Sequence, residues 1–139
     1  MLWNPVASVN WWDEELRKRW RQTGFWEVVN SRTGQVFRVK TSHLDDAENN
    51  RARLDPVGNA ERLRVPLLTV VATADESVAP ASGRRLASAA GTFGVLREIS
   101  GSGHTFGAAH PFPGPTPALE EAIRATREHF DRTLSGASS

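Results

Sequence analysis

Two residues of this chain have the types and the surroundings that acid–base chemistry needs. Asp75 follows a short apolar run, and His104 lies in the glycine-rich stretch ISGSGHTFGAAHPF at 99–112, directly after a second apolar run. A carboxylate bound to one imidazole nitrogen fixes the tautomer of the ring and stabilises the imidazolium, which leaves the other nitrogen to act as a general base. The alternative is structural, with Asp75 holding a turn or capping the helix that follows it.

The elements around these residues follow the order strand, helix, strand. Apolar runs at 65–73 and 95–99 predict two strands, and residues 80–90, closed by Gly91, predict the helix between them. Such a βαβ unit normally has parallel strands and a right-handed crossover. Because open α/β sheets place their chemistry at the carboxyl ends of the strands, we expect Asp75 and His104 to lie within hydrogen-bonding reach.

A last helix is predicted from Pro117 to Leu134, with Thr116 as its cap. The apolar stripe that we expect to face the core consists of Leu119, Ile123, Thr126, Phe130 and Leu134. His43 and His129 are interpreted as solvated helix residues, and residues 135–139 as a disordered tail.

Residues 1–64 differ from the rest in composition. All five tryptophans lie within the first 26 residues, namely Trp3, Trp11, Trp12, Trp20 and Trp26. We expect them to serve packing or a subunit contact, with the wall of an apolar acyl pocket as the alternative. The segment 11–39 is expected to cover the carboxyl ends of the strands as a lid.

Three short elements are predicted within this first part of the chain. Residues 13–24 predict a helix with an Asp13 N-cap and a Gly24 stop. Residues 25–39 alternate around Arg32-Thr33-Gly34 and predict a hairpin, and residues 42–64 predict one or two short exposed helices.

The composition is that of one globular domain. The 139 residues include 39% hydrophobic and 24% charged residues and carry a formal net charge of +1, a balance with no general attraction to nucleic acid or membranes. The cluster of Arg17, Lys18, Arg19 and Arg21 is interpreted as a solvated helix face. The absence of cysteine excludes disulfides, thiol chemistry and cysteine metal sites. No apolar run approaches the roughly 20 residues of a membrane span, so we expect a cytoplasmic protein.

Two stretches of the sequence resemble a known superfamily. PLLTVVATADESVAP (66–80) and LREISGSGHTFGAAHPF (96–112) are similar to the acid turn and the histidine loop of α/β-hydrolases, in particular of dienelactone hydrolases and acyl-peptidase-like esterases. The resemblance implies that Asp75 and His104 are the catalytic acid and histidine. LWNPV (2–6) and NSRTGQV (30–36) resemble the exit of a preceding strand and a lid-like insertion.

The resemblance implies an α/β fold that corresponds to the C-terminal half of such a hydrolase. We expect a lid-like segment at 1–64, a βαβα unit with a short parallel sheet at 65–134 and the tail at 135–139. The family's G-x-S-x-G nucleophile elbow has no counterpart. Ser102 lies too close to His104 in sequence to be its usual partner, and the other serines considered lack the elbow context, namely Ser8, Ser77, Ser82 and Ser88.

Three functions follow from these residues. In the first, His104, oriented by Asp75, activates water or a hydroxyl from a second subunit to cleave a small-molecule activated ester, with no cofactor. In the second, the chain is a non-catalytic remnant or the complementing half of a serine hydrolase. In the third, His104, His110 and a carboxylate such as Asp75 hold a divalent ion that acidifies water, although their spacing matches no standard zinc motif and His110 more often structures a loop.

A homodimer is expected from the strand at 65–73. Its near-continuous apolar run is typical of a strand that is buried on both faces and paired on both sides. We expect its partner on one side to be largely missing, so that the open edge recruits a second copy of the chain.

Overall fold

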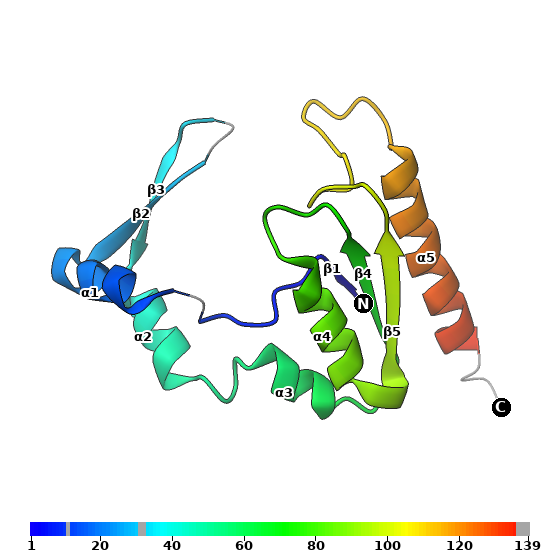
Figure 1. Ribbon diagram of the computed structural model, residues 1–139, viewed down its shortest axis with the longest axis horizontal. Helices are drawn as coiled ribbons and strands as arrows, with labels where there is room; N and C mark the ends of the chain where they lie inside the picture. The colour runs from blue at the N-terminus through cyan, green and yellow to red at the C-terminus, as the bar shows by residue number, and fades with distance from the viewer. Residues whose placement is uncertain (11, 31–32, 136–139) are drawn as a thin grey trace. The chain divides into compact units, whose positions relative to one another are not determined.

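The computed structural model describes residues 1–10, 12–30 and 33–135 (Figure 1). The chain forms two compact units: the hairpin unit, Val9–Asp55, and the sheet unit, which joins Met1–Ser8 to the chain from Pro56 onward. Residues 1–8 and 56–64 thus fold with the sheet. The expected division placed all of residues 1–64 in a separate lid-like segment. In the described part of the chain, no helix is both long enough and apolar enough to cross a membrane.

The sheet unit is built on three parallel strands in the order β1 (Leu2–Trp3), β4 (Leu67–Ala72) and β5 (Gly94–Ile99). The coarse expectation of an α/β protein with a short parallel sheet is therefore confirmed. As expected, the partner of β4 on one side is largely missing, because β1 pairs with only two of the six residues of β4. The backbone of β1 pairs with it at Leu2↔Thr69 and Trp3↔Val70, and β5 pairs along its whole length.

Helices cover both faces of this sheet, as the alternation of β4 side chains shows (Figure 1). Leu68, Val70 and Ala72 pack against the α5 side (Pro117–Leu134). Leu67 packs in a second cluster with α4 (Pro80–Ala89) and α3 (Pro56–Glu61). A short 3-10 helix, Gly91–Phe93, leads from α4 into β5. Successive side chains of a strand point to opposite faces. Because helices cover both faces of the sheet, every residue of β4 is buried, as its apolar sequence predicts.

Two glycines allow α4 to lie close to the sheet. A Cβ added at Gly83 would stand 2.3 Å from Val71 Cγ2, and one added at Gly94 would stand 1.9 Å from the Ala87 carbonyl oxygen. Real carbon atoms do not approach so closely, so the packing of α4 depends on the missing side chains at both positions.

The buried face of α5 differs from the predicted stripe. Ala122, Ala125 and His129 are its buried residues, whereas Ile123, Phe130 and Leu134 are exposed. Leu119 is only partly buried and packs against the core beside Ala118. Small alanines bring the helix backbone close to the sheet, which turns the bulkier side chains outward. The interpretation of His129 as a solvated residue is wrong, because the residue is only 2% exposed.

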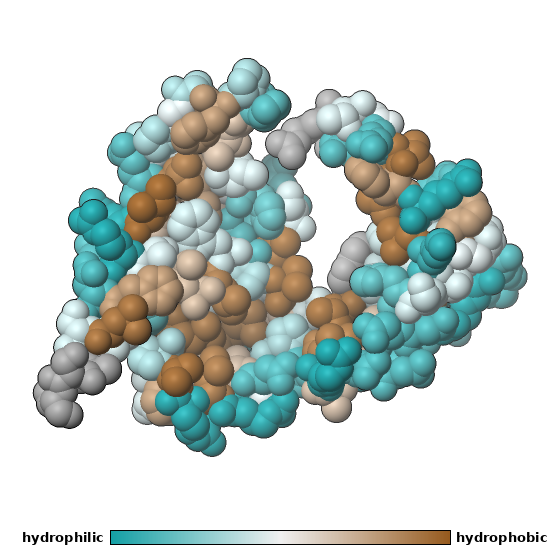
Figure 2. Space-filling model, turned by 180° about the vertical axis from the view of Figure 1, so that it is seen from behind, coloured by the Kyte–Doolittle hydropathy of each residue, from teal (hydrophilic) through white to brown (hydrophobic). Residues whose placement is uncertain are grey.

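Apolar side chains remain on the surface of the sheet unit. These exposed side chains include Trp3 on β1 and Val6 shortly after it. Others are Val95 and Leu96 on β5, and Ile123 and Phe130 on α5. Figure 2 shows apolar side chains gathered on the side turned away from the viewer of Figure 1.

The hairpin unit consists of α1 (Glu14–Thr23), β2 (Phe25–Val29), β3 (Val36–Lys40) and α2 (Thr41–Asn49). The predicted caps of α1 are confirmed: the Asp13 carboxylate accepts a hydrogen bond from the Leu16 N–H at 2.7 Å, and Gly24 ends the helix at φ 78°. β2 and β3 pair antiparallel as the predicted hairpin, in which Arg32 lies outside the described residues.

Most of the tryptophans form the core of the hairpin unit. Trp12 and Trp20 are buried with Leu44 and Ala47, and Trp26 packs against them. The Trp20 indole donates a hydrogen bond to the Val39 carbonyl at 2.8 Å. Packing is therefore the role that the structure shows for these rings. Trp11 and residues 136–139 of the predicted tail lie outside the described residues, and the lid role of 11–39 stays a prediction.

Candidate active site

Asp75 lies in the turn that follows β4, where the chain supplies two donors to one carboxylate oxygen. The N–H groups of Ser77 and Val78 donate to Asp75 Oδ1 at 2.8 and 2.9 Å. The Asp75 side chain is 1% exposed. Because the turn satisfies Oδ1, the second oxygen is left to bind a side chain, and the carboxylate has a fixed direction.

His104 provides that side chain from the turn after β5. Its Nδ1 lies 2.7 Å from Asp75 Oδ2, while the imidazole is 43% exposed. An ionised carboxylate only accepts hydrogen bonds, so Nδ1 carries the proton in this contact. The structure thus brings together the two residues that the parallel strands were predicted to bring together.

Main-chain hydrogen bonds continue the strand pairing into the two turns and hold them in register. The N–H of Thr73 donates to the Ile99 carbonyl at 3.0 Å, and the N–H of Ala74 donates to the Ser102 carbonyl at 3.1 Å. The Gly101 N–H donates to Thr73 Oγ1 at 3.0 Å. The distance between Asp75 and His104 is therefore set by backbone as well as by their own contact.

The pKa of the Asp75 carboxyl lies below its ordinary value although the group is buried. Burial by itself raises this pKa, but the hydrogen bonds from the Val78 N–H, from His104 and from the Ser77 N–H together outweigh it. The carboxylate is therefore ionised at neutral pH. It can balance the charge that forms on His104 when the imidazole accepts a second proton.

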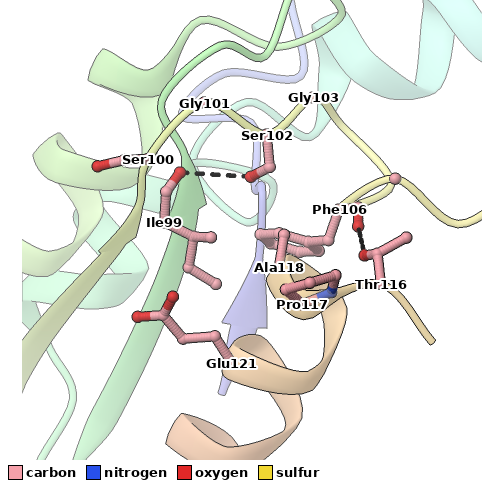
Figure 3. Close-up of a pocket in the computed structure, with 11 residues that line it drawn as sticks. Ile99, Ser100, Gly101, Ser102, Gly103, Phe106, Thr116, Pro117, Ala118 and Glu121 are labelled. Carbon is pink, nitrogen blue, oxygen red and sulfur yellow. Dashed lines mark hydrogen bonds between the residues drawn. The ribbon is translucent and has the colours of Figure 1, made fainter.

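The other ring nitrogen, Nε2, has no hydrogen-bond partner among the residues that the structure describes. Ser102 is not directed to it, because its buried hydroxyl donates to the Ile99 carbonyl at 3.3 Å (Figure 3). Ser77 contributes its backbone N–H to Asp75, and Ser82 and Ser88 lie within α4. Ser102 thus does not supply a hydrogen-bonded nucleophile to His104.

His110 lies in the exposed loop between β5 and α5 and does not join this site. Over residues 1–10, 12–30 and 33–135, no group of three histidine or carboxylate side chains converges in a way that could hold a metal ion. His104, His110 and Asp75 therefore do not form the ligand set that a metal-dependent hydrolase would need.

A cavity of about 440 Å³ lies beside the turn that carries His104. In Figure 3 it is bounded by the end of β5, by the turn through Gly101 and Gly103, and by the first turns of α5, from which Glu121 points toward it. Its apolar lining comes from Ile99, Phe106, Pro117 and Ala118. Neither Asp75 nor His104 lines this cavity.

One residue of the arrangement was not predicted. Asn4, directly after β1, donates from its amide nitrogen to the His104 carbonyl at 2.7 Å. Its amide oxygen accepts from the Ala72 N–H, also at 2.7 Å. The signal in the sequence is an Asn-Pro pair at the exit of a short apolar stretch, which points to a turn but not to a partner a hundred residues away.

Fold and site together define the class: an α/β protein with a carboxylate–imidazole pair at the carboxyl edge of a parallel sheet. No protein-family model matches the chain, and none of the curated proteins compared with it matches its sequence. Assignment of an activity consequently depends on the chemistry of the pair itself.

Proposed function

We propose that this protein is an ester hydrolase of the α/β-hydrolase type in which Asp75 and His104 are the acid and the base. The observation that carries the proposal is the 2.7 Å contact between a buried carboxylate and a half-exposed imidazole at the ends of neighbouring parallel strands. A purely structural ion pair does not need a histidine whose second nitrogen faces outward from a glycine turn. The resemblance of both turns to those of α/β-hydrolases supports the same assignment.

In the proposed reaction His104 acts first as a base and then as an acid, while Asp75 stays ionised. His104 Nε2 accepts a proton from water as the water oxygen attacks the ester carbonyl, and the resulting imidazolium is stabilised by ionised Asp75. When the tetrahedral intermediate collapses, the carbon–oxygen bond to the alcohol breaks. Nε2–H then gives its proton to the leaving alkoxide. The products are a carboxylic acid and an alcohol, and both protein groups return to their starting state.

A second candidate function is that of a complementing half, in which another polypeptide supplies a serine to His104 and this chain alone is inactive. Two observations favour it. The Ser102 hydroxyl is bound to the Ile99 carbonyl rather than to Nε2, and in the described parallel sheet both edge strands, β1 and β5, have a partner on one side only. In the first candidate the reacting hydroxyl belongs to water, and in this one it belongs to a protein side chain.

The test is the hydrolysis of p-nitrophenyl acetate by the purified chain and by two variants. His104→Ala is expected to lower the rate about 100-fold or more, the usual contribution of a general base. His110→Ala removes an exposed imidazole outside the site and serves as the matched control, with an expected rate equal to that of the wild type. Equal rates for all three proteins would reject the proposal.

If the wild-type chain hydrolyses no ester, the complementing-half function takes precedence. That function predicts covalent labelling of a serine in a second polypeptide by a fluorophosphonate probe only when this chain is present. Labelling that is the same with wild type and with His104→Ala would contradict it.

A further inference from the structure

The exit of β1 holds the turn that carries His104, although the two segments lie at opposite ends of the chain. Asn4 as a whole residue is only 7% exposed. It bridges the last N–H of β4, on Ala72, and the carbonyl of His104 by two hydrogen bonds of 2.7 Å each. The N–H of Asn4 is itself bound to the Val70 carbonyl at 2.9 Å. One side chain therefore fixes the main chain of His104 relative to the strand that precedes Asp75.

Only an amide of this length can make both contacts. The Ala72 N–H needs an acceptor and the His104 carbonyl needs a donor. A carboxylate at this place would present an oxygen to the carbonyl oxygen, and an apolar side chain would leave both backbone groups without a partner. The backbone adds a second restriction, because Asn4 has φ 41°. Asparagine, aspartate and glycine adopt this left-handed conformation most readily.

A neighbouring contact anchors the other end of the same turn. The Trp3 and Phe106 rings meet edge to face with centroids 5.3 Å apart, and the Phe106 N–H closes a turn onto the Gly103 carbonyl at 2.9 Å. Among the described residues, Asn4 and Phe106 are the two non-glycine residues with positive φ, at 41° and 53°. Backbone held in such sparsely populated regions is concentrated at functional sites, where the surroundings must enforce it.

The geometry points to Asn4 as a positioning residue of the Asp75–His104 pair. Its carboxamide holds the His104 main chain at the distance from β4 at which Nδ1 meets Asp75 Oδ2. The bond between Asn4 and the His104 carbonyl touches neither the substrate nor Nε2, so its effect on catalysis passes through the orientation of the imidazole. As a statement about catalysis this inference rests on the proposed function, whereas the positioning itself can be measured without any substrate.

The decisive variant is Asn4→Asp, which keeps the shape, the tolerance of positive φ and the acceptor for Ala72 but loses the donor to His104. The readout is the Nδ1 proton resonance of His104 in protein labelled with ¹⁵N-histidine, assigned by its absence from His104→Ala. We expect a slowly exchanging, downfield Nδ1–H in the wild type and its loss, by exchange with water, in Asn4→Asp. The kcat for p-nitrophenyl acetate should fall about 10- to 100-fold with little change in KM, as expected for a misplaced catalytic group.

The matched control is Asn50→Asp, since Asn50 in the hairpin unit likewise donates a hydrogen bond from its side-chain amide, in this case to the Asp46 carboxylate at 2.8 Å. This control should leave the His104 resonance unchanged. Asn4→Gly is the second variant, because glycine keeps the positive φ and removes both hydrogen bonds. In the wild type, the bond itself is expected to give a through-hydrogen-bond coupling between the Asn4 amide nitrogen and the His104 carbonyl carbon.

An unchanged Nδ1 resonance in folded Asn4→Asp, or the absence of that coupling, would overturn the positioning role. Loss of folding in both Asn4 variants would also overturn it, since Asn4 would then support the whole fold rather than one turn. A wild type that shows the Nδ1 resonance and its loss in Asn4→Asp, but no ester hydrolysis, would refute the proposed function and leave the positioning role intact.

Discussion

Asp75 Oδ2 and His104 Nδ1 lie 2.7 Å apart because the strands that precede them are parallel neighbours that end at the same edge of the sheet. The turn after β4 directs the carboxylate with two N–H groups, and the turn after β5 leaves the imidazole half exposed. The two nitrogens of the His104 ring therefore differ in their surroundings. A buried carboxylate binds one ring nitrogen, and the other has no hydrogen-bond partner among the described residues.

The stability of the fold is predicted to fall as the pH is lowered through the range in which histidine titrates. Burial of His129, whose side chain lies against the sheet, holds its pKa below the ordinary value of 6.5. The unfolded chain therefore takes up a proton at higher pH than the folded chain does. The stabilisation is present above about pH 6.5 and is lost as the pH falls toward the lower pKa of the folded state.

Urea unfolding at about pH 7.5 and about pH 5.5 measures this effect. The drop in unfolding free energy should be smaller in His129→Gln than in the wild type, whereas His110→Gln, at an exposed position, should behave as the wild type. An equal drop in all three proteins would show that His129 is not the responsible group.

The Thr69 hydroxyl is predicted to destabilise the protein. Thr69 is fully buried in β4, and its Oγ1 finds no hydrogen-bond partner among the described residues. Thr69→Val keeps the shape and removes the unsatisfied group, so the free energy of unfolding should rise by about 1 kcal/mol.

The same substitution at Thr126 is expected to have the opposite effect on the free energy of unfolding. Thr126 Oγ1 accepts from the Trp3 indole at 3.0 Å and donates to the Ala122 carbonyl at 2.8 Å. Thr126→Val should therefore lower the free energy of unfolding. Thermal melts of both variants beside the wild type make the comparison, and two shifts of the same sign would refute the argument.

Close packing of α4 predicts that Gly83→Ala is destabilising by about 1–3 kcal/mol, because its Cβ would overlap Val71 Cγ2 at 2.3 Å. Gly103→Ala is the control, since a Cβ there would meet only the Ala74 carbonyl oxygen at 3.9 Å. Similar denaturation midpoints for the two variants would show that the helix can move away from the sheet at no cost.

The chain is predicted to be a homodimer. β5 pairs along the whole length of β4, whereas on the other side β1 pairs only with Thr69 and Val70. The exposed apolar side chains of the sheet unit, such as Trp3, Val6 and Phe130, are what a second copy would cover. Sedimentation velocity at low micromolar concentration should give twice the mass of the chain, and a cooperative, folded monomer would contradict the prediction.

The parts of the fold that could be predicted are those encoded by local patterns. The uninterrupted apolar run of β4, the glycine stop after α4 and the cap of α5 each act within a few residues. From these elements the meeting of Asp75 and His104 follows, because parallel strands bring their carboxyl ends together.

The parts that could not be predicted depend on tertiary packing. The face that α5 buries is lined by Ala122 and Ala125, which carry a weaker hydrophobic signal than the exposed Ile123 and Phe130. Burial of His129 follows from that face. The bond from Asn4 to the His104 carbonyl joins residues one hundred positions apart, and no local pattern encodes such a contact.

The most direct measurement of the central claim is a double-mutant cycle on p-nitrophenyl acetate hydrolysis with Asp75→Asn, His104→Ala and the double variant. If Asp75 acts only through the imidazole, Asp75→Asn should lower kcat about 100-fold in the wild type and should have no further effect in His104→Ala. The double variant should then be as slow as His104→Ala alone. Rate losses that multiply in the double variant would contradict the account, because Asp75 and His104 would then act independently.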